Sequence, residues 1–147
     1  MRTQKLTLTD CPDAARLHQL SFYKGWSEKD FEEFLADPLT QGLKSEEGGK
    51  LCGYILWREI GEEAEILTLV VAPDFQRRGL GSHLLDALFQ RLGEQGVSTL
   101  FIEVAEDNEG AHLFYLKQGF NLISKRPNYY QREENKYVSA WNYIKKL

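Results

Sequence analysis

Residues 66–82, ILTLVVAPDFQRRGLGS, decide the fold of this chain more than any other stretch. The apolar run Ile66–Val71 is typical of a buried strand, and it ends before Pro73. A turn with glycines follows, and a helix with one apolar face begins at Gly79. A strand, a turn and a helix in this order leave unpaired backbone N–H groups and the positive end of the helix dipole at the turn. The stretch therefore predicts an anion-binding turn within an α/β fold.

The turn carries residue types that suit a phosphate group. Gly79 and Gly81 lack a Cβ atom, so a phosphate can approach the backbone amides closely. Arg77 and Arg78 add positive charge and hydrogen-bond donors. We expect a phosphate-bearing ligand to bind at the start of this helix. The alternative is a plain strand-to-helix turn with arginines on its surface.

Length and composition exclude several classes of protein. The 147 residues, 42% hydrophobic and 27% charged, predict a single globular domain over residues 1–147. A formal net charge of −4 argues against nucleic-acid binding and is compatible with a cationic substrate. No apolar stretch approaches the ~20 residues that span a bilayer, so no membrane partner is expected. Cys11 and Cys52 stand alone, which predicts neither a metal site nor a disulfide and favours the cytoplasm.

Hydrophobic periodicity and turn signals predict the order of the elements. A strand is expected over 3–9, and Asp10 is expected to cap a helix over 11–23. Further helices are expected over 27–36, 79–93 and 108–118, and further strands over 39–45, 50–59, 64–71, 97–104, 120–124 and 137–144. The order predicts an α/β (α+β) sandwich, in which about four helices flank a mixed, mostly antiparallel sheet of about six to seven strands. Its one parallel crossover is expected around 79–93.

The turn and the segments after it resemble a known family. Gln76-Arg77-Arg78-Gly79-Leu80-Gly81 resembles the pyrophosphate-binding motif Q/R-x-x-G-x-G/A of the GNAT acetyltransferase superfamily. The chain is also similar to the ribosomal-protein-alanine N-acetyltransferases (the RimI family). The segments that carry this similarity are Trp26–Glu28, Glu65–Val71, Leu100–Val104, Asn108, Leu113–Tyr115, Gly119–Phe120 and Arg126–Tyr130. The resemblance is close over 64–130 and weak after Tyr130, and it implies the GNAT fold.

The resemblance implies acetyl-coenzyme A (acetyl-CoA) as acetyl donor. Its pyrophosphate would lie on the amides of the turn, and its pantetheine arm along the preceding strand. Asn108 would hydrogen-bond the same arm. The residues implied in binding the donor are Leu69, Val70, Val71, Gln76, Arg77, Arg78, Gly79, Leu80, Gly81, Ser82 and Asn108.

Two residues match the catalytic positions of the family. Strand alternation places Glu103 on one face with Phe101, so a charged side chain lies among apolar ones. The resemblance implies that Glu103 is the general base, acting through water, and a structural carboxylate is the alternative. It also implies that Tyr115 is the general acid that protonates the departing thiolate of coenzyme A. The alternative for Tyr115 is a core aromatic residue beside Phe114.

The acceptor side is less determined by sequence. Trp26, Tyr129 and Tyr130 could line a peptide groove, and each could equally be a core residue. His18, His83 and His112 are isolated in sequence, and His83 and His112 are expected to be surface or hydrogen-bonded residues rather than ligands. Ala105 stands where the family commonly has an arginine, and the segment after Tyr130 departs from the family.

The expected function is N-acetyl transfer from acetyl-CoA to a primary amine by direct attack in a ternary complex. The resemblance favours the N-terminal α-amine of a protein such as a ribosomal protein. Two alternatives stay open: an acetyltransferase for a small amine (a polyamine or an aminoglycoside), and a non-catalytic acyl-CoA-binding module. Whether the protein is a monomer or a dimer is also left open.

Overall fold

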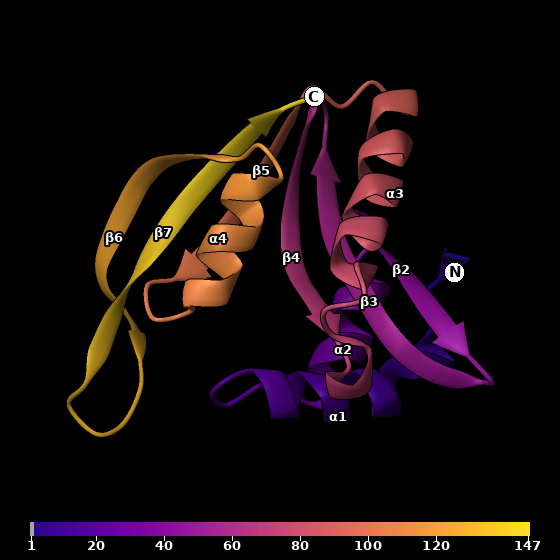
Figure 1. Ribbon diagram of the computed structural model, residues 1–147, viewed down its shortest axis with the longest axis horizontal. Coiled ribbons are helices and arrows are strands. Elements are labelled where there is room, and N and C mark those ends of the chain that lie inside the picture. The colour runs from indigo at the N-terminus through magenta and orange to yellow at the C-terminus, as the bar shows by residue number, and fades with distance from the viewer. Residues whose placement is uncertain (1) are drawn as a thin grey trace.

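The computed structural model describes residues 2–147, which form a seven-stranded sheet with helices on both faces (Figure 1). The strands are β1 (Gln4–Lys5), β2 (Thr40–Glu47), β3 (Lys50–Ile60), β4 (Glu63–Val71), β5 (Thr99–Ala105), β6 (Asn121–Gln131) and β7 (Tyr137–Lys146). The helices are α1 (Cys11–Ser21), α2 (Glu28–Ala36), α3 (Leu80–Glu94) and α4 (Glu109–Lys117). The strand order is β1-β2-β3-β4-β5-β7-β6, and the pair β4–β5 is parallel while the other neighbours are antiparallel. The predicted mixed sheet with a crossover through α3 is confirmed.

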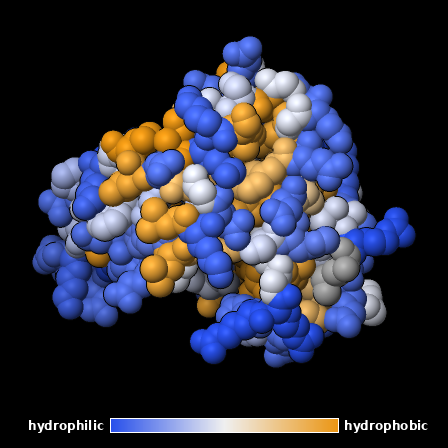
Figure 2. All heavy atoms as spheres, turned by 45° about the horizontal axis from the view of Figure 1, so that its top comes forward, coloured by the Kyte–Doolittle hydropathy of each residue, from blue (hydrophilic) through white to orange (hydrophobic). Residues whose placement is uncertain are grey.

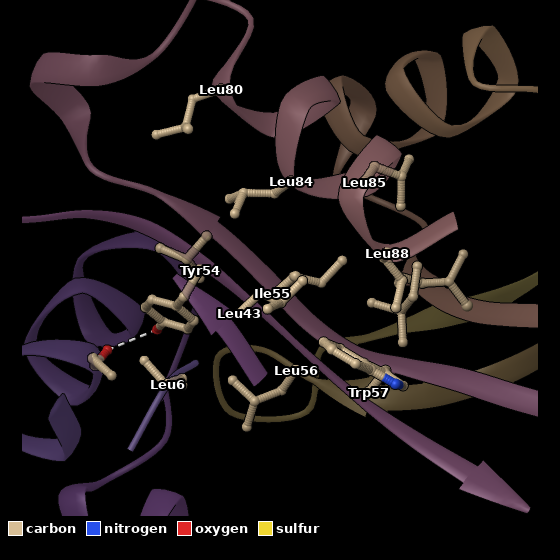
Figure 3. Close-up of a cluster of buried hydrophobic side chains, with 14 of the residues drawn as sticks. Leu6, Leu43, Tyr54, Ile55, Leu56, Trp57, Leu80, Leu84, Leu85 and Leu88 are labelled. Carbon is tan, nitrogen blue, oxygen red and sulfur yellow. Dashed lines mark hydrogen bonds between the residues drawn. The ribbon is translucent and has the colours of Figure 1, made fainter. Parts of the chain in front are cut away.

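The two faces of the sheet are covered by different helices. On β3, Tyr54 points to α1, where its hydroxyl donates a hydrogen bond of 2.7 Å to the carbonyl oxygen of Ala14 (Figure 3). Its neighbour Ile55 points to the opposite face, toward Leu84 and Leu88 of α3 (Figure 3). Alternation along β3 thus separates an α1/α2 side from an α3/α4 side.

Local signals explain two of the helices. The leucines of α3 lie on one face, as predicted, and all are buried: Leu80, Leu84, Leu85, Leu88 and Leu92. Helix α2 begins with a capping box, in which the Asp30 amide donates to Ser27 Oγ at 3.1 Å and the Ser27 amide donates to Asp30 Oδ2 at 2.8 Å. The helix therefore starts where its sequence predicts.

The N-terminal segment differs from the prediction. The strand expected over 3–9 is wrong beyond Gln4–Lys5, since residues Leu8–Asp10 form a 3-10 turn. Asp10 precedes α1 but does not cap it with its side chain. Instead, Asp10 Oδ2 accepts from the Thr7 amide at 2.8 Å, and Oδ1 accepts from Lys44 Nζ at 2.7 Å. The carboxylate thus bends the chain into the turn, and the alternating pattern does not reveal this.

Strands β4 and β5 separate halfway along their length. They pair from Glu63 to Ile66, with Ile66 opposite Ile102 as the last pair. A bulge follows at Leu67. Its neighbours Ile66 and Thr68 lie opposite two consecutive residues of β3, Trp57 and Leu56, so Leu67 has no partner on β3. Beyond this point the two strands diverge, as Figure 1 shows. The split opens beside the turn that leads into α3.

Strand β6 is the edge of the sheet and is longer than the predicted 120–124. Its pairing with β7 shifts between Arg126 and Tyr130, and Asn128 within this bulge has a left-handed φ of 50°. Sequence patterns do not predict the full strand for two reasons. It contains a proline, and it has no buried face that would make apolar and polar residues alternate. The bulge brings Tyr130 opposite Val138 of β7.

The surface is mixed in character. Hydrophilic residues cover much of the face in Figure 2, with hydrophobic side chains gathered between them. Exposed apolar residues include Leu113 and Leu116 of α4. Within residues 2–147, no helix is long and apolar enough to cross a membrane.

Candidate active site

The turn before α3 presents unpaired backbone amides. The first helical hydrogen bond runs from the His83 amide to the Gly79 carbonyl oxygen at 3.0 Å. The amides of Leu80, Gly81 and Ser82 therefore have no hydrogen-bond partner among residues 2–147. Gly79 has a φ of 77°, in the left-handed region that favours glycine. The predicted anion-binding turn thus has the required geometry at the positive end of α3.

Side chains around the turn hold it and leave its arginines exposed. Gln76 Nε2 donates to the Val71 carbonyl oxygen at 3.1 Å, which ties the turn to β4. Gln76 therefore braces the turn with its side chain. Arg77 and Arg78 are exposed, and the Arg78 guanidinium lies 5.2 Å from the centroid of the Phe75 ring.

The start of α3 packs against α4. A Cβ atom built on Gly81 would lie 3.4 Å from the Phe114 ring. Ser82 Oγ accepts a hydrogen bond of 2.9 Å from Gln118 Nε2. Glycine at position 81 thus permits close helix packing, and a larger side chain would collide with Phe114 or fill the approach to the amides.

The edge of β4 beyond the bulge offers backbone groups to the split. The Ala72 amide donates to the Cys52 carbonyl oxygen of β3 at 2.8 Å. Because backbone groups alternate in direction along a strand, Val70 is turned toward β3, while Leu69 and Val71 are turned toward the split. Of these three predicted donor-binding residues, Leu69 and Val71 have outward-facing backbone groups.

Glu103 lies on β5, one residue past the last pair with β4. Its neighbour Ile102 pairs with Tyr143 of β7, and the Tyr143 hydroxyl is 2.6 Å from His112 Nδ1 of α4. Ile102 therefore faces α4, and Glu103 faces the α1/α2 side. The Tyr130 hydroxyl donates to Glu103 Oε1 at 2.7 Å, which leaves Oε2 for another partner. Burial and this hydrogen bond raise the pKa of Tyr130, so its hydroxyl stays a donor.

Tyr115 lies on the opposite side of the sheet, in α4. It is 4% exposed and packs edge-on against Phe114 and Phe120, with ring centroids 5.1 and 5.4 Å away. Burial raises its pKa, which keeps the hydroxyl protonated. That hydroxyl has no hydrogen-bond partner in the part of the chain that the structure describes. Tyr115 is thus a core aromatic residue whose hydroxyl keeps a free proton donor.

The loop between β5 and α4 joins the two sides. Asn108 caps α4, since its Oδ1 accepts from the Ala111 amide at 3.3 Å. The preceding Asp107 accepts two hydrogen bonds from Arg132, at 2.7 Å from Nε and 2.8 Å from a terminal nitrogen. These bonds lower the pKa of Asp107. The Arg132 guanidinium also lies 5.8 Å from the Tyr23 ring, so it links the β6–β7 hairpin to the loop after α1.

The other predicted aromatic residues divide between core and surface. Trp26 is half-buried and packs against His18, Phe31 and Phe34 at the border of the core, whereas Tyr129 is exposed. His18 and His112 are buried with both ring nitrogens hydrogen-bonded, and His83 is exposed. Within residues 2–147, no group of three His, Cys, Asp or Glu side chains could hold a metal ion.

Sequence patterns missed several of these contacts. Tyr130 binds Glu103 across 27 positions and Arg132 binds Asp107 across 25, so no local spacing indicates either pair. The tyrosine pair at 129–130 is part of the family pattern. Its contact with Glu103 joins β6 to β5, two strands that are not neighbours in the sheet.

The split sheet with an anion-binding turn at its mouth fits the acetyltransferase site that the family resemblance implies, and comparisons with known proteins agree. The chain matches the Acetyltransferase (GNAT) family over residues 11–120. It is 37% identical over 130 residues to the [ribosomal protein bS18]-alanine N-acetyltransferase of Escherichia coli (strain K12), covering 85% of this chain and 84% of that protein. It is 32% identical over 132 residues to N-alpha-acetyltransferase RimI of Mycobacterium tuberculosis (strain H37Rv), covering 86% of this chain and 82% of that protein.

Solved structures show the same relation. The crystal structure of the ribosomal-protein-S18-alanine N-acetyltransferase from Escherichia coli superposes with a TM-score of 0.89 at 31% identity, covering 99% of this chain and 92% of that chain. The chain therefore belongs to the GNAT acetyltransferase family and, within it, to the RimI family of N-acetyltransferases. It is an acetyl-CoA-dependent N-acetyltransferase, as predicted.

Proposed function

We propose that this enzyme acetylates the N-terminal α-amine of a protein, with a ribosomal protein that begins with alanine as acceptor. The relative from Escherichia coli is named for this reaction on bS18, and it supports the proposal. The observation that carries the mechanism is the placement of Glu103 and Tyr115. Glu103 lies on β5 one residue past the last pair with β4, and Tyr115 lies in α4 on the other side of the sheet, so that one carboxylate and one phenol are available for the two proton transfers.

Acetyl-CoA fits the α3/α4 side of the split. Its pyrophosphate would bind the amides of Leu80–Ser82, where the turn leaves three donors unpaired and the helix dipole favours negative charge. Its pantetheine arm would run along the outward backbone groups of Leu69 and Val71. The Nδ2 group of Asn108 remains available to the same arm, because only Oδ1 is used in capping α4. The thioester would then lie in the split.

The transfer needs one proton to leave the acceptor and one to reach the leaving group. Glu103 takes a proton from the amine through water, using Oε2 while Tyr130 holds Oε1. The amine lone pair forms the new C–N bond at the thioester carbonyl carbon, and the C–S bond breaks. Tyr115 donates its hydroxyl proton to the departing sulfur. No cysteine is needed, since the amine attacks the donor directly.

An α-amine suits this machinery better than a lysine side chain. With a pKa near 8, roughly a tenth of an α-amine is neutral at pH 7, against less than about a thousandth of a lysine amine. A single water-relayed carboxylate is therefore sufficient for an N-terminal amine. The acceptor would enter on the α1/α2 side, where Arg132 connects the hairpin to the loop after α1.

The same proposal covers domain organisation and compartment. We take residues 1–147 as one acetyltransferase domain acting in the cytoplasm. Cys11 and Cys52 are free and buried, which is typical of a protein in a reducing compartment.

Two variants test the proton steps. Glu103→Gln and Tyr115→Phe should each lower kcat for an alanine-starting peptide by about 100-fold or more, with the dissociation constant of acetyl-CoA changed by less than about twofold. Glu94→Gln, an exposed carboxylate at the end of α3, is the matched control and should leave kcat unchanged. Unchanged turnover in Glu103→Gln would remove its assignment as base.

A further inference from the structure

His18 of α1 is a buried histidine with a defined hydrogen-bond arrangement. It is 4% exposed, and its ring stacks on Trp26 with centroids 4.5 Å apart. The Trp26 amide donates to His18 Nδ1 at 2.9 Å, so Nδ1 is an acceptor. Nε2 of the neutral ring then carries the hydrogen and donates to Thr68 Oγ1 at 3.1 Å. Burial lowers the pKa of His18 to about 4, which agrees with a neutral ring at pH 7.

Thr68 lies at the split, level with Glu103. The last pair of β4 and β5 is Ile66 with Ile102, and Leu67 is the extra residue of the bulge. If the bulged residue Leu67 is not counted, Thr68 is the first residue of β4 after the last pair, and Glu103 is the first residue of β5 after it. Thr68 faces the α1/α2 side because it contacts His18, and Glu103 faces the same side. The two side chains therefore flank the split where the acceptor amine enters.

The hydrogen bond from His18 leaves part of the Thr68 hydroxyl free. A hydroxyl oxygen has two lone pairs, and His18 uses one of them. Among residues 2–147, Thr68 Oγ1 has no other side-chain partner. A second lone pair thus remains on an oxygen whose position is fixed by a buried ring, and Thr68, which is 5% exposed, lies on the side of the sheet that Glu103 faces.

We infer that Thr68 binds the acceptor amine together with Glu103, and that His18 is the positioning residue that holds the Thr68 hydroxyl in place. A neutral primary amine has two N–H groups and one lone pair. One N–H donates a hydrogen bond to the water that relays its proton to Glu103, and the other N–H donates a hydrogen bond to Thr68 Oγ1. The lone pair is then directed at the thioester carbon. This inference rests on the proposed function and adds a reason for preferring primary amines.

An acceptor peptide with an N-methylated terminus distinguishes amine binding by Thr68 from a purely structural role of this residue. A neutral N-methylalanine terminus has a single N–H, which Glu103 requires, so Thr68 has nothing to accept. Thr68→Val, which keeps the shape and removes the hydroxyl, should lower kcat/KM for an alanine-starting peptide by about tenfold. It should change kcat/KM for the N-methylalanine peptide by less than about twofold. Thr68→Ser should retain the alanine activity within about threefold, and His18→Gln should lower it with the same selectivity between the two peptides.

The outcomes distinguish the inference from the function on which it rests. An equal loss on both peptides, or no loss on either, would overturn the role of Thr68. If Glu103→Gln keeps full activity, the proposed base is wrong whatever Thr68 does. If Glu103→Gln is inactive and Thr68→Val is fully active, only this inference fails. Should Thr68→Val not fold, Thr68→Cys with its weakly accepting thiol takes its place in the same comparison.

Discussion

Neutral, buried His18 should make the stability of the enzyme fall in mild acid. Burial lowers its pKa to about 4 in the folded protein, against 6.5 in the unfolded chain, with Asp30 opposing the shift. Below pH 6.5 the unfolded chain binds a proton that folded His18 does not, so unfolding is favoured. The stabilisation is fully present above pH 6.5 and is lost as the pH falls toward 4. Each pH unit in this window costs about 1.4 kcal/mol.

Urea denaturation at pH 7 and pH 5 measures this contribution. The two pKa values give a loss of about 2 kcal/mol between these pH values from His18 alone. Between pH 7 and pH 5, the unfolding free energy of the wild-type protein should fall by this amount more than that of His18→Gln, because the glutamine at position 18 does not titrate. His83→Gln, which removes the exposed histidine of α3, is the control and should keep the wild-type pH dependence. Equal pH dependence in wild type and His18→Gln would refute the buried neutral ring.

Three further substitutions test the core, the donor site and the acceptor side. Leu88→Ala removes a fully buried side chain and should lower the unfolding free energy by about 3 kcal/mol in urea; a loss below about 1 kcal/mol would contradict the packing of α3. Gly81→Val should weaken acetyl-CoA binding about tenfold or more by calorimetry, while Gly93→Ala, with open space around it, should not; equal affinities would argue against the amide site. Arg132→Ala should raise the peptide KM several-fold with little change in the acetyl-CoA KM. It should lower the unfolding free energy by less than about 1 kcal/mol, because the Arg132–Asp107 pair is partly exposed. An unchanged peptide KM would show that the hairpin has no part in acceptor binding.

Local sequence signals account for most of the fold. The apolar face of α3, the capping box of α2 and the run Ile66–Val71 each act through neighbours within one helical turn or one strand. Their positions were predicted to within a few residues. The anion-binding turn belongs largely to this class, since its glycines and the start of α3 lie within residues 76–82, although α4 packs against it through Phe114 and Gln118.

The remaining features depend on contacts that are distant in sequence. Lys44 reaches Asp10 across 34 positions, and this contact replaces the expected strand and cap near the N-terminus. The split between β4 and β5 depends on a bulge at Leu67, where no glycine or proline marks an interruption. His18 contacts Thr68 across 50 positions, so its isolation in sequence concealed its role. Contacts of this kind arise only once the chain has folded.

The central claim is transfer of an acetyl group to an N-terminal α-amine with Glu103 as base. The most direct measurement incubates acetyl-CoA with an alanine-starting peptide that also contains an internal lysine, and locates the acetyl group by fragment mass spectrometry. Wild-type enzyme should acetylate the α-amine and leave the lysine unmodified, and Glu103→Gln should acetylate neither. Acetylation of the lysine alone, or of free polyamines with the peptide left untouched, would contradict the account.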